Sequence, residues 1–300
     1  MALTSSDLRG IIVAIVTPFN TKDELNVPGI KTLVDYLAEN RVHGIMTTGG
    51  NGEFPHLTQE ERKKVLDVIV ERVPSKIPII ACTSACATRE VITLSQHAKD
   101  TGADAVILTP PYYFDLPPSA ILEHYKLLAD AVDIPIVPYN NPTYTRFNID
   151  PKLMVNLSKI EGVIGLKQSN ANISELVEIL RLTGKKLAVL TGIDSQLYAA
   201  LCLGAKGVFS TAACVYPGQM VELYESFQNG RREAALKLHE KLQVVNKFFE
   251  YEPGYVSPCK EALNMLGLPA GHVRKPMPSL TKEERAQLKD ALIQIGLKPR

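Results

Sequence analysis

Two side chains at the ends of apolar segments are the ones best suited to covalent and acid–base chemistry. Lys167 closes an apolar run at 163–166, where its amine is partly withdrawn from water. Desolvation disfavours the charged ammonium, and a neutral amine can attack a ketone to form a Schiff base. Tyr139 closes the segment 135–139, and a phenol in a dry pocket transfers protons when a neighbour tunes it. The plainer alternatives are a lysine paired with a carboxylate and a half-buried tyrosine with a satisfied hydroxyl.

A glycine-rich turn, GGNGE at 49–53, follows another apolar segment. Its backbone N–H groups are not shielded by Cβ atoms, and such a concavity can hold a carboxylate or a phosphate. The spacing is neither GxGxxG nor that of a P-loop, which argues against a nucleotide. An ordinary glycine turn is the alternative.

The remaining reactive residue types show no site pattern. No cysteine pair or Cys/His cluster has zinc spacing, and the six histidines form no i, i+4 ligand pair. The five cysteines are expected to be reduced, buried thiols in a cytoplasmic protein. The N-terminus has no secretory pattern, and the apolar run at 11–16 is shorter than the roughly 18 residues that cross a bilayer. We therefore expect no metal site and no membrane segment.

The elements that must position these groups are eight short apolar segments, several without alternation, as expected of strands buried on both faces of a parallel sheet. The predicted strands are Ile11–Thr17, Gly44–Thr48, Ile77–Thr83, Ala105–Thr109, Pro135–Tyr139, Val163–Lys167, Leu187–Thr191 and Gly207–Ser210. Amphipathic segments lie between them. Eight strand–helix units predict an α/β protein with a closed (β/α)8 TIM barrel, and an open doubly wound sheet is the alternative. Active sites of such barrels lie at the carboxyl ends of the strands, where Lys167, Tyr139 and the glycine turn fall.

The strand signals stop near Gly230, and three further helical patterns follow. We therefore expect a catalytic barrel over residues 1–229 and a C-terminal three-helix extension over 230–300, packed on the barrel.

Composition excludes several classes of protein. The 300 residues carry 33 Lys+Arg and 32 Asp+Glu, a net charge of +1, so no net field attracts nucleic acid or an anionic membrane. The hydrophobic share of 45% excludes disorder as the main state. Trp is absent and aromatic residues make up 6%, which argues against a surface for stacking bases.

Six motifs in chain order resemble the family of dihydrodipicolinate synthase and N-acetylneuraminate lyase. They are GGNGE (49–53), PPYY (110–113), YNNP (139–142), GLK (165–167), G-x-D (192–194) and GAKGVFST (204–211), and the match covers nearly the whole chain. The resemblance implies a class I, lysine-dependent aldolase on a TIM barrel. It also implies a homotetramer that needs no metal or organic cofactor.

The resemblance assigns roles to single residues. Lys167 would form the Schiff base with pyruvate or another 2-oxo acid, and Tyr139 would shuttle the proton. The turn at Gly50 and Asn51 would bind the pyruvyl carboxylate. Tyr113 matches a tyrosine that in many members reaches into the neighbouring subunit's site.

Four further positions are expected to bind substrate. Ser169 belongs to a K-Q-S stretch similar to the K-Q-T of the lyases, and Gly192 opens the G-x-D motif. Asp194 and Ser210 match positions that hold sugar hydroxyls in sialic acid lyases.

Two departures from the family pattern bear on the reaction. Ser or Thr is usual at position 50, and its hydroxyl links the two tyrosines in a proton relay; Gly50 removes it, leaving Thr47, Thr48 or a water as candidates. Dihydrodipicolinate synthases usually carry an arginine where this chain has Tyr144, with Arg146 two positions further on. The missing charge-assisted contact argues against lysine biosynthesis.

We therefore expect a carbon–carbon lyase that reversibly cleaves a 2-keto-3-deoxy (sugar) acid to pyruvate and an aldehyde. A 2-keto-3-deoxy acid dehydratase and 4-hydroxy-tetrahydrodipicolinate synthase are alternatives on the same lysine imine. A pseudoenzyme that binds 2-oxo acids is the non-enzymatic alternative.

Overall fold

The computed structural model describes residues 3–74, 76–250 and 254–300. Its eight parallel strands form a closed barrel in chain order, which confirms the predicted TIM barrel. Every strand residue is buried, because a parallel sheet is covered on both faces. The strands are β1 (Gly10–Ala14), β2 (Gly44–Thr47), β3 (Ile79–Cys82), β4 (Ala105–Leu108), β5 (Ile136–Asn140), β6 (Gly165–Gln168), β7 (Ala188–Thr191) and β8 (Gly207–Ser210).

Helices follow the strands, and the last three form the predicted C-terminal helical part. The α-helices are α1 (Val27–Glu39), α2 (Gln59–Arg72), α3 (Thr88–Thr101), α4 (Pro118–Ala131), α5 (Pro142–Thr145), α6 (Pro151–Leu157), α7 (Ile173–Thr183), α8 (Leu197–Leu203), α9 (Pro217–Gln228), α10 (Arg232–Glu250), α11 (Val256–Met265) and α12 (Lys282–Gln294). The short 3₁₀ helices are η1 (Phe54–His56), η2 (Gly184–Lys186), η3 (Asp194–Gln196) and η4 (Ala212–Cys214).

Local sequence signals explain where several helices begin and end. Thr58 and Glu61 form a complete capping box at the start of α2. The Asp150 side chain accepts a hydrogen bond from the Leu153 N–H at the start of α6. Gly102 ends α3 with a φ of 101°, a left-handed conformation that favours glycine.

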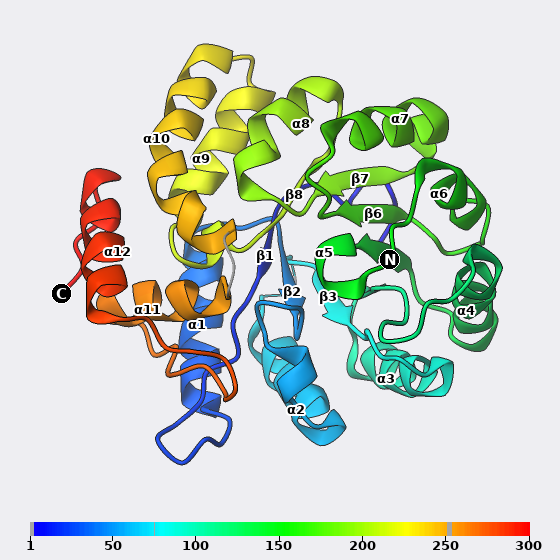
Figure 1. The fold of residues 1–300 in the computed structure, drawn as a ribbon, viewed down its shortest axis with the longest axis horizontal. Coiled ribbons are helices and arrows are strands. Elements are labelled where there is room, and N and C mark those ends of the chain that lie inside the picture. Colours follow the sequence, from blue (N-terminus) through cyan, green and yellow to red (C-terminus); the bar gives the residue numbers. More distant parts are fainter. Residues whose placement is uncertain (1–2, 75, 251–253) are drawn as a thin grey trace. The chain divides into compact units, whose positions relative to one another are not determined.

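The chain divides into two compact units, and the first comprises Met1–Gly10 and Pro78–Phe209. It holds β3 to β7 and most of β8. Outside these strands, α3 packs against α4, α4 against α6, α6 against α7 and α7 against α8 (Figure 1). Within this unit, β5 pairs with β6 in a register that places Tyr139 directly opposite Lys167.

The second unit comprises Ile11–Ile77 and Ser210–Arg300. It joins β1 from Ile11 onward, β2 and their helices to the C-terminal helices. Helix α10 packs against α9, α11 and α12 (Figure 1). The boundary predicted between residues 229 and 230 falls inside this unit and stays a prediction.

Candidate active site

Lys167 and Tyr139 form the centre of the candidate site in the first unit. Their Cα atoms are paired across β5 and β6, and neighbouring parallel strands project paired side chains from the same face. Both residues are 5% exposed. The Lys167 Nζ lies 4.1 Å from the centre of the Tyr139 ring and 5.6 Å from that of Phe209. The register therefore brings an amine and a phenol together in a setting largely withdrawn from water.

The Tyr139 hydroxyl is held from its own strand end. It accepts a hydrogen bond from the Asn141 Nδ2 at 3.0 Å. The Asn141 side chain thereby fixes the hydroxyl while leaving its proton available for donation, which suits a group that passes protons.

Asn140 locks β5 to β6 and was missed by the sequence analysis. Its Nδ2 donates to Gln168 Oε1 and Asn148 Oδ1, each at 2.8 Å, and its Oδ1 accepts from the Ile149 N–H at 2.9 Å. Asn140 is fully buried. It stands directly after Tyr139 in the YNNP motif, so its polar type at the end of an apolar strand was the signal that could have found it.

A buried hydroxyl and a glycine adjoin Lys167. The Ser169 Oγ is buried and has no hydrogen-bond partner among the described residues, which a bound polar ligand would provide. A Cβ at Gly192 would overlap this hydroxyl and lie 2.9 Å from the Lys167 Cε. Gly192 is therefore required by space, because a side chain there would displace the Ser169 hydroxyl and crowd the Lys167 Cε.

Two further candidates, Asp194 and Tyr113, also belong to the first unit. Asp194 begins η3, three residues after the end of β7, and is 3% exposed. Tyr113 is 88% exposed, with a φ of 89°, and its ring meets Phe114 edge to face at 5.1 Å. Tyr113 thus points outward from its own chain, whereas Lys167, Tyr139, Ser169 and Gly192 are brought together.

The glycine turn lies in the second unit, after β2. The Glu53 N–H donates to the Gly50 carbonyl at 3.0 Å, and the Thr17 hydroxyl donates to the Gly52 carbonyl at 2.7 Å. Among the described residues, the N–H groups of Gly50 and Asn51 donate to no backbone carbonyl. These two donors are the ones that the sequence analysis assigned to a carboxylate.

Asn51 supports the turn with its side chain. Its Nδ2 donates to the Ala14 carbonyl at 2.5 Å and lies 3.7 Å from the Cys259 Sγ. Its Oδ1 is buried without a hydrogen-bond partner in the part of the chain that the structure describes. Burial raises the pKa of the Cys259 thiol, so this neighbour stays neutral.

Tyr255 reaches the same turn, and nothing in the sequence pattern pointed to it. A Cβ built on Gly50 would overlap the Tyr255 hydroxyl. Thr47 and Thr48, the replacements considered for the missing hydroxyl, are both buried with their Oγ1 atoms 3.5 Å apart. Ser210, the last second-unit candidate, accepts a hydrogen bond from the N–H of Ala213 in η4 at 2.8 Å.

A buried ion pair anchors the end of the turn. The Lys260 Nζ lies 2.6 Å from Glu53 Oε1, with both side chains at most 2% exposed. Burial lowers the pKa of Lys260, and the Glu53 carboxylate opposes this shift. The second Glu53 oxygen accepts from the Arg274 N–H at 2.9 Å.

Arg274 connects this anchor to helix α2. Its guanidinium makes a two-pronged contact with the Glu61 carboxylate at 2.6 and 2.7 Å, and this contact lowers the pKa of Glu61.

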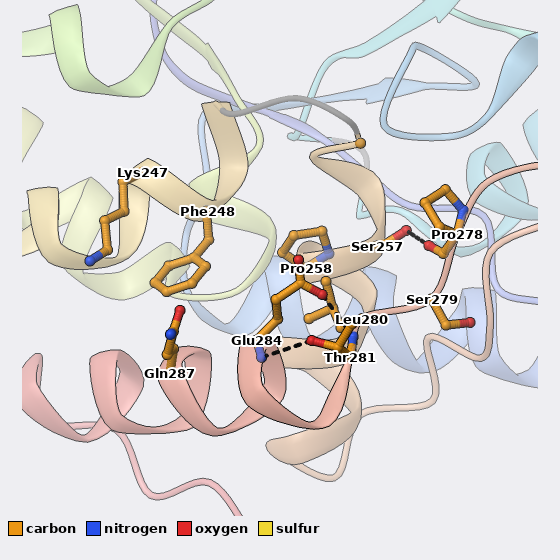
Figure 2. Close-up of a pocket in the computed structure, with 11 residues that line it drawn as sticks. Lys247, Phe248, Ser257, Pro258, Pro278, Ser279, Leu280, Thr281, Glu284 and Gln287 are labelled. Atoms are coloured by element: carbon orange, nitrogen blue, oxygen red, sulfur yellow. Dashed lines mark hydrogen bonds between the residues drawn. The ribbon is translucent and has the colours of Figure 1, made fainter.

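A cavity of about 510 Å³ lies elsewhere in the second unit. Figure 2 shows it between Phe248 of α10, Ser257 and Pro258 of α11, and Gln287 of α12. None of the predicted site residues lines it.

The described residues contain no group of three or more His, Cys, Asp or Glu that could hold a metal ion. Among the described residues, which include all five cysteines, no disulfide forms, and the expectation that all five are buried is wrong for Cys86 and Cys202, which are exposed. No helix in the described ranges is long and apolar enough to cross a membrane.

Comparisons with known proteins agree on one family. A sequence model of the dihydrodipicolinate synthetase family matches residues 7–295. A 4-hydroxy-tetrahydrodipicolinate synthase of Syntrophus aciditrophicus is 35% identical over 96% of this chain and 99% of its own. The crystal structure of dihydrodipicolinate synthase from Aquifex aeolicus is 34% identical, with a TM-score of 0.93 over 98% of this chain and 100% of its own. The structure of YagE, a prophage protein from E. coli K12 in complex with pyruvate, is 30% identical, with a TM-score of 0.93 over 97% of this chain and 99% of its own.

Proposed function

Because this chain belongs to the dihydrodipicolinate synthetase family, whose members are class I carbon–carbon lyases and synthases, we propose that it joins pyruvate to an aldehyde through a Schiff base on Lys167. The single observation that carries the proposal is the buried Lys167 amine 4.1 Å from the Tyr139 ring centre. An amine in such a place forms an imine when it is deprotonated.

The proposed reaction follows from these two groups. The Lys167 nitrogen attacks the C2 carbonyl of pyruvate and water leaves, giving a protonated imine. The imine withdraws electrons so that C3 loses a proton to the water released in the first step, and the resulting enamine attacks the aldehyde carbon. Tyr139 donates a proton to the alkoxide that forms and is reprotonated by the proton that C3 lost. Hydrolysis of the imine by water then frees the Lys167 amine. The imine is the electron sink, so the reaction as proposed uses no metal or organic cofactor.

The other candidates take binding roles in this proposal. The N–H groups of Gly50 and Asn51 hold the pyruvyl carboxylate. The unpartnered Ser169 hydroxyl meets a polar group of the substrate, and Gly192 keeps the space that the Lys167 side chain needs. Asp194 and Ser210 are assigned to hydroxyl or amine groups of the aldehyde half.

The first aldehyde to test is aspartate semialdehyde. The curated relatives that cover 94–97% of this chain are named 4-hydroxy-tetrahydrodipicolinate synthase. They favour this synthase reaction over the sugar-acid cleavage expected from the sequence.

Cleavage of a 2-keto-3-deoxy acid remains the second candidate because of helix α5. Tyr144 stands where an arginine is usual and is 51% exposed, and Arg146 is also exposed, with a φ of 57°. An aldehyde that carries a carboxylate would therefore lack a positively charged partner at position 144. An aldehyde recognised through its hydroxyl groups needs no such partner.

Borohydride trapping tests the shared imine. Pyruvate and borohydride should add one covalent pyruvyl mass to Lys167 in the wild type, and Lys167→Arg should abolish the addition. Trapping at another lysine, or none in the folded protein, would refute the proposed chemistry.

Product analysis separates the candidates. Consumption of pyruvate with aspartate semialdehyde supports the synthase, pyruvate release from a panel of 2-keto-3-deoxy acids supports the lyase, and loss of water with an intact carbon skeleton supports a dehydratase.

We further propose a cytoplasmic homotetramer in which the exposed Tyr113 and Phe114 contact a second copy of the chain. Light scattering of wild type and Tyr113→Ala tests the interface, because loss of a central aromatic contact weakens association.

A further inference from the structure

We infer that Tyr255 is a substrate-binding residue, whose hydroxyl takes the place of the side chain that Gly50 lacks and donates a hydrogen bond to the substrate carboxylate. The inference rests on the proposed function, in which the glycine turn holds that carboxylate.

Space, and not backbone conformation, explains the glycine at position 50. Gly50 is not among the residues of positive φ, so its backbone would accept an L side chain. A Cβ there would overlap the Tyr255 hydroxyl oxygen but would lie 3.5 Å from the Tyr255 Cζ, an ordinary van der Waals separation. The overlap therefore comes from the hydroxyl alone.

The position of this hydroxyl matches what an anion needs. Within the described ranges, the Gly50 and Asn51 N–H groups make no hydrogen bond to a backbone carbonyl. A carboxylate has about four lone-pair sites and accepts several donors at once. The Tyr255 hydroxyl, against Gly50, adds a side-chain donor to these two backbone donors.

Helix α11 fixes Tyr255 at the turn. Tyr255 is the residue before the helix, and two residues of the helix contact the turn further along: Cys259 approaches Asn51 at 3.7 Å, and Lys260 pairs with Glu53 at 2.6 Å. Gly50, Asn51 and Glu53 of the turn thus meet Tyr255 and one side of α11.

The opposite side of α11 faces elsewhere. Ser257 and Pro258 line the cavity of Figure 2, where the Ser257 hydroxyl donates to the Pro278 carbonyl at 2.6 Å. The rotation of α11 about its axis therefore decides that its N-cap residue, Tyr255, meets the turn.

Tyr255→Phe tests the role directly. Loss of a hydrogen bond to a charged group predicts a rise of roughly ten- to a hundredfold in the KM for pyruvate, with the covalent trapping of Lys167 at saturating pyruvate preserved. Tyr36→Phe is the matched control: its hydroxyl donates to the Val215 carbonyl at 2.8 Å in the same unit. It should lower thermal stability and leave the KM unchanged.

A double-mutant cycle tests whether the hydroxyl replaces a side chain at position 50. Gly50→Ser alone collides with the Tyr255 hydroxyl and should raise the KM and lower the melting temperature. Gly50→Ser combined with Tyr255→Phe removes the collision and returns a hydroxyl to the turn. The KM should fall back to within about fivefold of the wild type, a strongly non-additive result.

Two outcomes overturn the inference while the proposed function stands: normal trapping with an unchanged KM in Tyr255→Phe, or a double variant no better than Tyr255→Phe. Absence of trapping in the wild type overturns the proposed function and the role of Tyr255 together.

Discussion

The chemistry of single residues in the first unit depends on how closely small groups pack around Lys167. A Cβ at Gly192 would overlap the Ser169 hydroxyl and come within 2.9 Å of the Lys167 Cε, closer than a normal contact. The amine itself lies over the ring of Tyr139. At this scale a change of one atom is expected to alter reactivity with little effect on the fold.

Gly192→Ala should slow imine formation by about a hundredfold, because displacing a reacting group by about 1 Å has effects of this size. The measurement is the rate of borohydride trapping with pyruvate, with circular dichroism to show that the fold is retained. Ser169→Ala, which adds no atom, is the control and should slow trapping much less. Equal trapping rates in wild type and Gly192→Ala would contradict the spatial requirement.

Tyr139→Phe should reduce turnover by roughly 10²- to 10⁴-fold, the usual contribution of a positioned proton donor. Trapping of pyruvate on Lys167 should persist, because the ring remains and only the hydroxyl is lost. Turnover assays and trapping on the same preparation check both parts. Turnover within a few-fold of wild type would exclude Tyr139 as the proton shuttle.

At the scale of elements, helix α11 and the glycine turn form one structure in the second unit. The buried Glu53–Lys260 pair fastens the turn to the helix, and Arg274 extends the attachment to α2 through Glu61. A C-terminal helix thus serves as a support for the loop after β2.

Lys260→Met should destabilise the protein by about 3–5 kcal/mol, because it leaves the Glu53 carboxylate buried without its partner. Glu53→Gln combined with Lys260→Met should recover much of this loss, since no uncompensated charge remains. Urea unfolding of the single and double variants measures the difference. A single-variant loss below about 1 kcal/mol would argue that the pair is not an anchor.

At the scale of the whole molecule, each unit has its own buried polar groups, and these couple global stability to pH. His124 of α4 is 3% exposed, and its Nδ1 lies 2.9 Å from the Thr88 hydroxyl. Burial lowers the pKa of His124 from 6.5 to about 4. The folded protein therefore holds this imidazole neutral, whereas the unfolded chain binds a proton below pH 6.5.

Stability should consequently fall as the pH drops from about 6.5 to about 4, by about 3 kcal/mol from this residue, and this contribution should level off at lower pH. The free energy of unfolding of wild type minus that of His124→Gln isolates the effect, because the other titrating groups cancel. The difference should be largest above pH 6.5. Parallel pH profiles for the two proteins would show that His124 is not held neutral.

The sequence by itself predicted the barrel and the three C-terminal helices, which the structure confirms, and it singled out Lys167 and Tyr139 as candidates. It could do so because apolar runs are local features of the sequence: β8 was predicted to the residue. The ends of other strands were less exact, as at β1, predicted over Ile11–Thr17 and found at Gly10–Ala14, because hydrogen bonding to neighbouring strands sets where a strand ends.

Only the tertiary structure decided which distant residues meet. The overlap of Tyr255 with the side-chain space of Gly50, and the pairing of Lys260 with Glu53, join segments some 200 residues apart. The exposure of Tyr113 was likewise open in the sequence. No local pattern encodes such contacts, because they are set by how α11 is rotated against the turn after β2, and that rotation is decided by packing across the fold.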